Sequence, residues 1–172
     1  MELNARKKNK ENGFTLIELL LYISLASLIL LAVSSVMVTT FEIRQKEHLI
    51  GEVEEQGALA AYTIENYLRG ARSIISPIQN YSQNHFQIDR TVAQGNSSVQ
   101  IFEKEGVLFV QEGAETPQVL TTSPVQVTEV EFKNISLPNT KGLIEYHFTL
   151  TASDASGRAE YHKSFTGGAA VR

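Results

Sequence analysis

Glu18 is a single carboxylate near the start of a long apolar stretch. The sequence turns from charged to apolar at Phe14, and after Glu18 no formal charge follows until Glu42. An acid at the centre of a membrane helix costs about 2.5–3.5 kcal/mol, less near its end, and such residues usually have a partner. One partner is local, because Thr15 and Glu18 fit the T-x-x-E capping box, in which the acid satisfies an early backbone N–H and is favoured by the helix dipole.

A second partner for Glu18 would be created by cleavage of the chain. A cut after Gly13 would leave an α-ammonium group on Phe14, at the depth of the membrane surface. Paired with Glu18 of a neighbouring helix, this cation would fix the axial register of a helical stack. The capping box and the intermolecular pair both remain open at this point.

Other candidate residues for chemistry are weaker. His147 and His162 could face each other across a hairpin at 153–157 as two ligands of a metal. We favour a solvated cross-strand pair over a metal site, because no third ligand is suitably spaced. Asp154 lies in a turn sequence that could instead bind calcium. No nucleophile motif such as G-x-S-x-G is present, and we expect no catalytic residue, no cofactor and no metal.

The apolar stretch is long enough to cross a bilayer. Leu19–Phe41 contains 23 consecutive uncharged residues, which as a helix would measure about 35 Å against a hydrocarbon core of about 30 Å. Residues 1–13 before it are basic, which predicts a cytoplasmic leader and an exported C-terminal part. Gly13 precedes the apolar run instead of following it, unlike the cleavage site of a classical signal peptide. We therefore assign 1–13 as leader and 14–41 as the membrane-spanning half of a helix.

Helical periodicity continues beyond the span. Apolar and small residues recur at spacings of three and four up to residue 75, before Pro77 stops the pattern. This predicted stripe consists of Ile50, Val53, Gly57, Ala60, Ile64, Leu68, Ala71 and Ile75. We predict one helix over about 15–75, with 42–76 as its amphipathic half and a bend near 51–57 where glycines weaken it. Glu52, Glu54 and Glu55 would form a solvated face or dock a basic patch on a neighbour.

Strand patterns fill the remainder, 77–172. In residues 143–151 apolar and polar side chains alternate with a period of two, and a slip in the alternation near Glu129 predicts a bulge. Turn sequences at 103–106 and 153–157 predict hairpins. The fold class is therefore α+β, a long helix packed on an antiparallel sheet. The further strands are expected at 85–89, 99–103, 107–111, 125–133 and 158–165.

Composition limits the possible partners. The chain has no cysteine, so an exported domain would be held by core packing alone. Without the leader the formal charge changes from −4 to −6. An acidic exported domain gives no electrostatic support for direct nucleic-acid binding.

Residues 13–20, Gly-Phe-Thr-Leu-Ile-Glu-Leu-Leu, resemble the type IV prepilin processing motif. The resemblance implies cleavage between Gly13 and Phe14 by the prepilin peptidase, N-methylation of Phe14, and a role for Glu18 in aligning subunits. It implies a structural, non-enzymatic subunit with other pilin or pseudopilin subunits, an inner-membrane assembly platform and the lipid bilayer as partners. The expected location is the bacterial inner membrane, single-pass with the head outside, and then a filament.

The subclass is inferred from two differences from major pilins and from a looser resemblance to minor subunits. Many major pilins have a proline in the membrane span and a C-terminal disulfide, and this chain has neither. The segment 66–72 and the late residues Val127, Val130 and Phe132 are similar to J-type minor pseudopilins and W-type minor pilins. The filament could serve type II secretion, a type IV pilus or DNA uptake. The alternative is an uncleaved single-pass protein with an exported β-rich binding or sensor domain.

Overall fold

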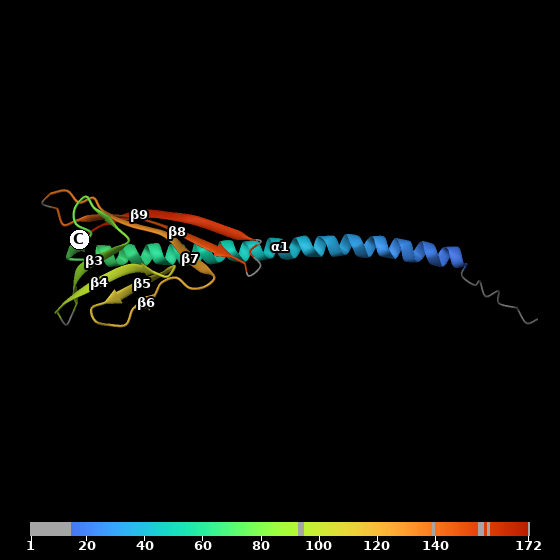
Figure 1. Cartoon of the computed structure of the whole chain (residues 1–172), viewed down its shortest axis with the longest axis horizontal. Helices are drawn as coiled ribbons and strands as arrows, with labels where there is room; N and C mark the ends of the chain where they lie inside the picture. The colour runs from blue at the N-terminus through green and yellow to red at the C-terminus, as the bar shows by residue number, and fades with distance from the viewer. Residues whose placement is uncertain (1–14, 93–94, 139, 155–156, 158, 172) are drawn as a thin grey trace, which may run out of the picture. The chain divides into compact units, whose positions relative to one another are not determined.

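A computed structural model describes residues 15–92, 95–138, 140–154, 157 and 159–171. Its first element is helix α1, Leu16–Arg69, which continues through Gly51 and Gly57 without interruption (Figure 1). The chain divides into two compact units, Met1–Ile43 and Arg44–Arg172, and α1 contributes to both. We call the second unit the head.

The helix ends earlier than we predicted. Gly70 N–H still bonds to Asn66 O at 3.1 Å, but Arg72 N–H donates to Asp89 O of a strand at 2.7 Å. The next residues form strand β1, Ser73–Ser76. The prediction of helix to 75 was therefore wrong, and the segment 42–76 includes β1. Glycine ends the helix here, and the β-branched pair that follows suits a strand.

The first sheet has five strands in the order β1-β3-β4-β5-β6, and every neighbouring pair is antiparallel. Its strands after β1 are β3 His85–Val92, β4 Gly95–Lys104, β5 Val107–Glu112 and β6 Gln118–Val119. The hairpin predicted at 103–106 joins β4 to β5.

The second sheet has four antiparallel strands in the order β2-β7-β8-β9. The strands are β2 Ser82–Gln83, β7 Val125–Asn134, β8 Leu143–Ser153 and β9 Glu160–Ala170. The predicted bulge is confirmed, since the β7–β8 register shifts between Val127 and Glu129. The pairing of β8 with β9 confirms the second hairpin, although 155–156 and 158 lie outside the described residues.

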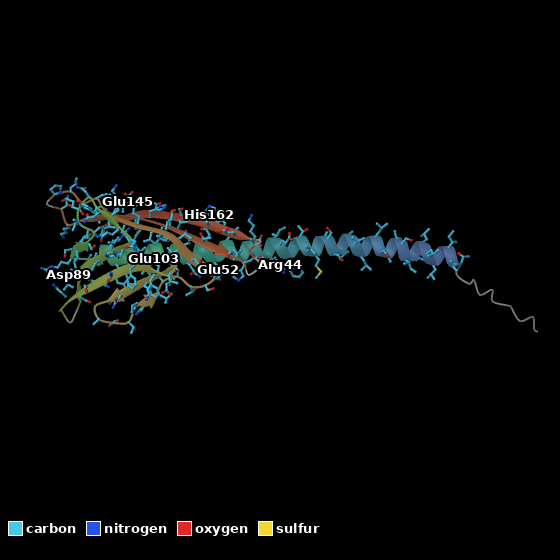
Figure 2. The ribbon with its side chains drawn as sticks, in the orientation of Figure 1. Arg44, Glu52, Asp89, Glu103, Glu145 and His162 are labelled. Atoms are coloured by element: carbon cyan, nitrogen blue, oxygen red, sulfur yellow. The ribbon has the colours of Figure 1, made fainter. Side chains whose placement is uncertain are left out.

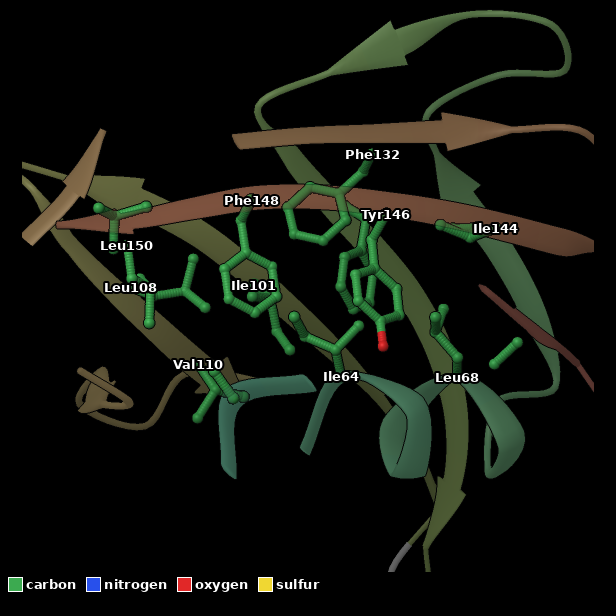
Figure 3. Close-up of a cluster of buried hydrophobic side chains, with 14 of the residues drawn as sticks. Ile64, Leu68, Ile101, Leu108, Val110, Phe132, Ile144, Tyr146, Phe148 and Leu150 are labelled. Atoms are coloured by element: carbon green, nitrogen blue, oxygen red, sulfur yellow. The ribbon is translucent and has the colours of Figure 1, made fainter. Parts of the chain in front are cut away.

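The core of the head lies between the helix and the inner faces of both sheets (Figure 3). Ile64 of α1 is fully buried among side chains of both sheets, including Ile101 of β4 and Phe148 of β8. The Phe86 and Phe132 rings meet edge to face with centroids 4.8 Å apart and thereby join β3 to β7. One apolar helix face thus unites two sheets, which confirms the expected α+β class.

The helix face in the core follows most of the predicted stripe. The buried helical residues are Leu49, Val53, Gly57, Ala60, Ile64 and Leu68. Leu49 was not in the predicted stripe, and its neighbour Ile50 is only half-buried. Ala71 is buried beyond the helix end, and Ile75 is 48 % exposed on β1.

Candidate processing and assembly site

Helix α1 begins with a side-chain cap. Thr15 Oγ1 accepts a hydrogen bond from Glu18 N–H at 3.3 Å, and Thr15 O accepts from Glu18 and Leu19 N–H at 3.1 and 3.2 Å. A threonine at this position satisfies an N–H that the helix itself cannot. The threonine half of the predicted capping box is therefore present. Gly13 and Phe14 lie outside the described residues.

The carboxylate of Glu18 is open to a partner from outside the chain. Glu18 is exposed in the first turn of the helix, where the dipole favours a negative charge. Among the described residues its carboxylate has neither a hydrogen-bond partner nor an ion-pair partner. The acid half of the capping box is accordingly not formed within that part of the chain.

The helix surface around Glu18 is apolar and uncovered. In the part of the first unit that the structure describes, every residue from Thr15 to Ile43 is exposed, with Leu16 at 77 % and Leu31 at 71 %. By length and composition α1 is apolar enough to cross a membrane. Such a surface is stable only in lipid or against other apolar helices.

Hydroxyl groups on this segment are satisfied within the helix. Ser27 Oγ donates to Ile23 O at 2.7 Å, and Thr40 Oγ1 donates to Val36 O at 2.8 Å. Ser24 and Thr39 bond back in the same way. Because these side chains do not need water, they are compatible with an apolar surrounding.

Polar contacts fasten the head half of α1 to the sheets. Lys163 Nζ of β9 donates to Glu54 Oε1 at 2.6 Å, and Tyr161 Oη donates to the same oxygen at 3.3 Å. Figure 2 labels two sequence neighbours of these residues, Glu52 of α1 and His162 of β9. The hydrogen bond from Lys163 is the main reason that the pKa of Glu54 lies below its ordinary value, and the same bond raises the pKa of Lys163. The prediction of a solvated acidic face did not include the ion pair of Glu54 with Lys163, whereas Glu55 is exposed.

Two tyrosines make similar contacts farther along the helix. Tyr146 Oη of β8 donates to Glu65 Oε1 at 3.0 Å, and Tyr67 Oη of α1 donates to Glu112 Oε1 of β5 at 2.6 Å. Burial, followed by the hydrogen bond to the carboxylate, raises the pKa of each tyrosine to about 12. Glu65 also pairs with Arg69 at 2.9 Å. The helix is thus tied to both sheets.

Gly57 allows α1 to lie close to Phe165 of β9. A Cβ atom at this position would lie 2.0 Å from Cζ of Phe165. The Phe165 ring is itself stacked on Phe148 with centroids 5.2 Å apart. Glycine is needed here for space, and the fixed ring leaves little room for adjustment.

The predicted histidine pair is not formed. His147 lies opposite Thr166 and bonds to its Oγ1 at 3.0 Å, whereas His162 lies opposite Thr151. The facing arrangement was wrong because the β8–β9 register could not be read from the hairpin sequence. The described residues contain no group of three or more His, Cys, Asp or Glu side chains that could hold a metal ion. Asp154 lies in a turn, where its Oδ1 accepts from Ala159 N–H at 3.1 Å.

The individual contacts between α1 and the sheets could not be predicted from local sequence patterns. Glu54 and Lys163 are separated by 109 residues, and Glu65 and Tyr146 by 81. The amphipathic pattern of the helix was the sequence feature that indicated such contacts in general.

Residues 8–34 match the family model described as the prokaryotic N-terminal methylation motif. This segment contains Gly13, Phe14 and Glu18, and the match supports membership of the type IV prepilin-like family. The family is one of structural subunits, and its motif together with the apolar helix supports a single-pass, membrane-anchored protein. No curated protein and no solved structure matches the chain.

Proposed function

We propose that this chain is a minor pilin or pseudopilin, a non-catalytic filament subunit processed by the prepilin peptidase. The observation that carries the proposal is the methylation motif over residues 8–34, with its acid exposed on an uncovered apolar helix. The peptidase would cut between Gly13 and Phe14 and methylate the new Phe14 amine. The leader 1–13 would remain in the cytoplasm, and the head would lie outside the inner membrane.

Assembly would bury the apolar helix laterally among the helices of other subunits. Each buried methylene group contributes about 0.8 kcal/mol when removed from water, but lipid already surrounds the helix. Packing between helices and polar pairing therefore decide the register. The amine of Phe14 on one subunit would meet the Glu18 carboxylate of its neighbour, and the pair would set the axial position of each helix.

The head would give the subunit its subtype specificity within the filament. The resemblance of segment 66–72 to J-type and W-type subunits favours a minor position over the major shaft. Type II secretion, a type IV pilus and a DNA-uptake filament are the systems that such a subunit would serve. Its partners would be other pilin-type subunits and the inner-membrane assembly platform, with no direct contact to nucleic acid.

Mass spectrometry of the native N-terminus tests processing. We expect a mature chain that begins with N-methylated Phe14, and a Gly13→Leu variant that retains the leader. A bulky residue at Gly13 should block the peptidase by steric exclusion at the cut. A chain that keeps Met1 in wild-type cells would instead favour the alternative, an uncleaved single-pass protein with an exported binding or sensor domain.

A second experiment tests the register. Glu18→Gln removes the charge while preserving the shape of the side chain, and we expect normal cleavage but reduced incorporation into filaments. Ser27→Ala is the matched control, because its hydroxyl bonds only to Ile23 O within the helix. Quantitative immunoblotting of sheared filaments against membranes measures incorporation. Equal incorporation of the Gln variant and the control would contradict the pairing role of Glu18.

A further inference from the structure

The edges of the two sheets differ in length. Three edge strands are short, since β1 has four residues and β2 and β6 have two each. The fourth edge strand, β9, has 11 residues and pairs with β8 over its whole length without a register shift. Folded proteins usually protect sheet edges with short strands, bulges, prolines or charges. Strand β9 has no proline and no bulge.

The other side of β9 is unpaired. Within the described residues, β8 is its only strand neighbour (Figure 1). Backbone N–H and C=O groups on that side of β9 therefore have no strand partner in the part of the chain that the structure describes. Such groups are best satisfied by an extended backbone laid alongside them.

The side chains of β9 do not block this edge. The cation that could protect it, Lys163, is turned to α1 and paired with Glu54. The outward positions from Ser164 onward carry small side chains, namely Ser164, Thr166, Gly168 and Ala170, and all four are exposed. The inward Tyr161 and Phe165 are only half-buried, so part of each ring remains uncovered.

We propose that β9 is a docking edge for an extended, amphipathic strand of a different protein chain, which would continue the second sheet. Apolar side chains on one face of that strand would cover Tyr161 and Phe165. The other face would carry Lys or Arg, because the outer surface of this sheet is acidic. Its exposed acids are Glu129, Glu131, Glu145 and Glu160, against the single cation Lys133.

The path of β9 along the helix disfavours a second copy as the occupant. Lys163 contacts Glu54 and Phe165 lies on Gly57, so β9 and α1 run in the same direction within the head. An antiparallel β9–β9 pair would point the two helices in opposite directions. A parallel pair would place them on opposite faces of the joined sheet. Neither arrangement lets two helices pack side by side in the same direction, as filament subunits would, so the choice of occupant rests on the proposed function.

A synthetic strand tests the edge directly. The probe is a ten-residue peptide of alternating valine and threonine with a lysine at each end, added to the full chain in mild detergent. Hydrogen exchange followed by mass spectrometry reports on segment 160–170. With the peptide at about ten times its Kd, we expect exchange at the free edge to slow about tenfold. The control peptide has the same side chains, but alternate backbone nitrogens on its docking edge are methylated, and we expect no protection from it.

Three results would overturn the proposal. They are no slowing of exchange in 160–170, equal slowing by the methylated peptide, and dimerisation through β9. Dimerisation is tested with Thr166→Cys, which introduces the only thiol in the chain. A second copy bound at β9 would yield a disulfide-linked dimer on mild oxidation. His147→Cys, one strand farther in and opposite Thr166, is the matched control. The N-terminal mass remains an independent readout, so failure of the edge and failure of the filament role are distinguishable.

Discussion

Gly57 is the position where one added methyl group gives the sharpest test of the head. An alanine at this site should gain about 1 kcal/mol in helix propensity over glycine. The new Cβ would, however, lie 2.0 Å from the Phe165 ring, and overpacking of this kind costs about 1–3 kcal/mol. The ring is held by Phe148 on its other side, so we expect a net loss of up to about 2 kcal/mol in the free energy of unfolding.

The same helix offers a matched control. A Cβ atom at Gly51 would have no atom within 4 Å, so Gly51→Ala should stabilise the head by about 1 kcal/mol. Both variants add one methyl group to a helical glycine of the head. The difference between them therefore isolates the contact with Phe165, and we expect it to be about 1–3 kcal/mol.

Urea unfolding of the full chain in mild detergent, followed by circular dichroism of the sheets, measures these differences. A double-mutant cycle completes the test, since Gly57→Ala in a Phe165→Ala background should stabilise as Gly51→Ala does. If Gly57→Ala alone stabilises as much as Gly51→Ala, the helix does not approach β9 as described and the reasoning fails.

Three further predictions concern the contacts that hold α1 to the sheets. The pKa values of Tyr67 and Tyr146, raised to about 12, predict a contribution to stability that is full below pH 10 and lost as the pH rises towards 12. In an ultraviolet titration of tyrosinate, Tyr67 and Tyr146 should lose their protons at higher pH than an ordinary tyrosine, and Tyr146→Phe should remove one of these two steps. Ordinary titration of all tyrosines would contradict this. The lowered pKa of Glu54 predicts a contribution present above pH 4.5 and lost on acidification, so the acid sensitivity of unfolding should diminish in Glu54→Gln. Ile64→Ala, at a fully buried site, should lower the free energy of unfolding by about 2–5 kcal/mol, and a loss below 1 kcal/mol would place Ile64 outside the core.

The amino-acid pattern predicted those elements whose signal is local. The alternation at 143–151 identified β8, and the irregular alternation near Glu129 identified the bulge, because side chains on opposite faces of a strand reveal its register. The Thr15 cap could also be read directly, since both partners lie within one turn. Glu18 is exposed, as the proposed pairing of its carboxylate with another chain requires.

Elements that depend on distant contacts were not predictable. The spacing of Ala71 and Ile75 continues the helical period, yet Arg72 N–H bonds to Asp89 O and the chain enters a sheet. The two-residue strands β2 and β6 are too short to give a period. His147 and His162 do not face each other, because the register of a hairpin depends on the geometry of its turn. At the helix end, a tertiary hydrogen bond outweighs a weak local preference.

The contacts between α1 and the sheets also have a mechanical consequence. Four side chains of α1 form hydrogen bonds outside the helix. Glu54 bonds to β9 and Gln56 to Thr122, while Glu65 bonds to β8 and Tyr67 to β5. A pull applied at Arg44 along the helix would load these bonds together in shear, because β9 runs alongside α1. Shear loading in parallel resists rupture better than peeling one bond at a time. The head is thus built to bear tension transmitted through its helix, and the force needed to detach it should rise with the number of these bonds that remain intact.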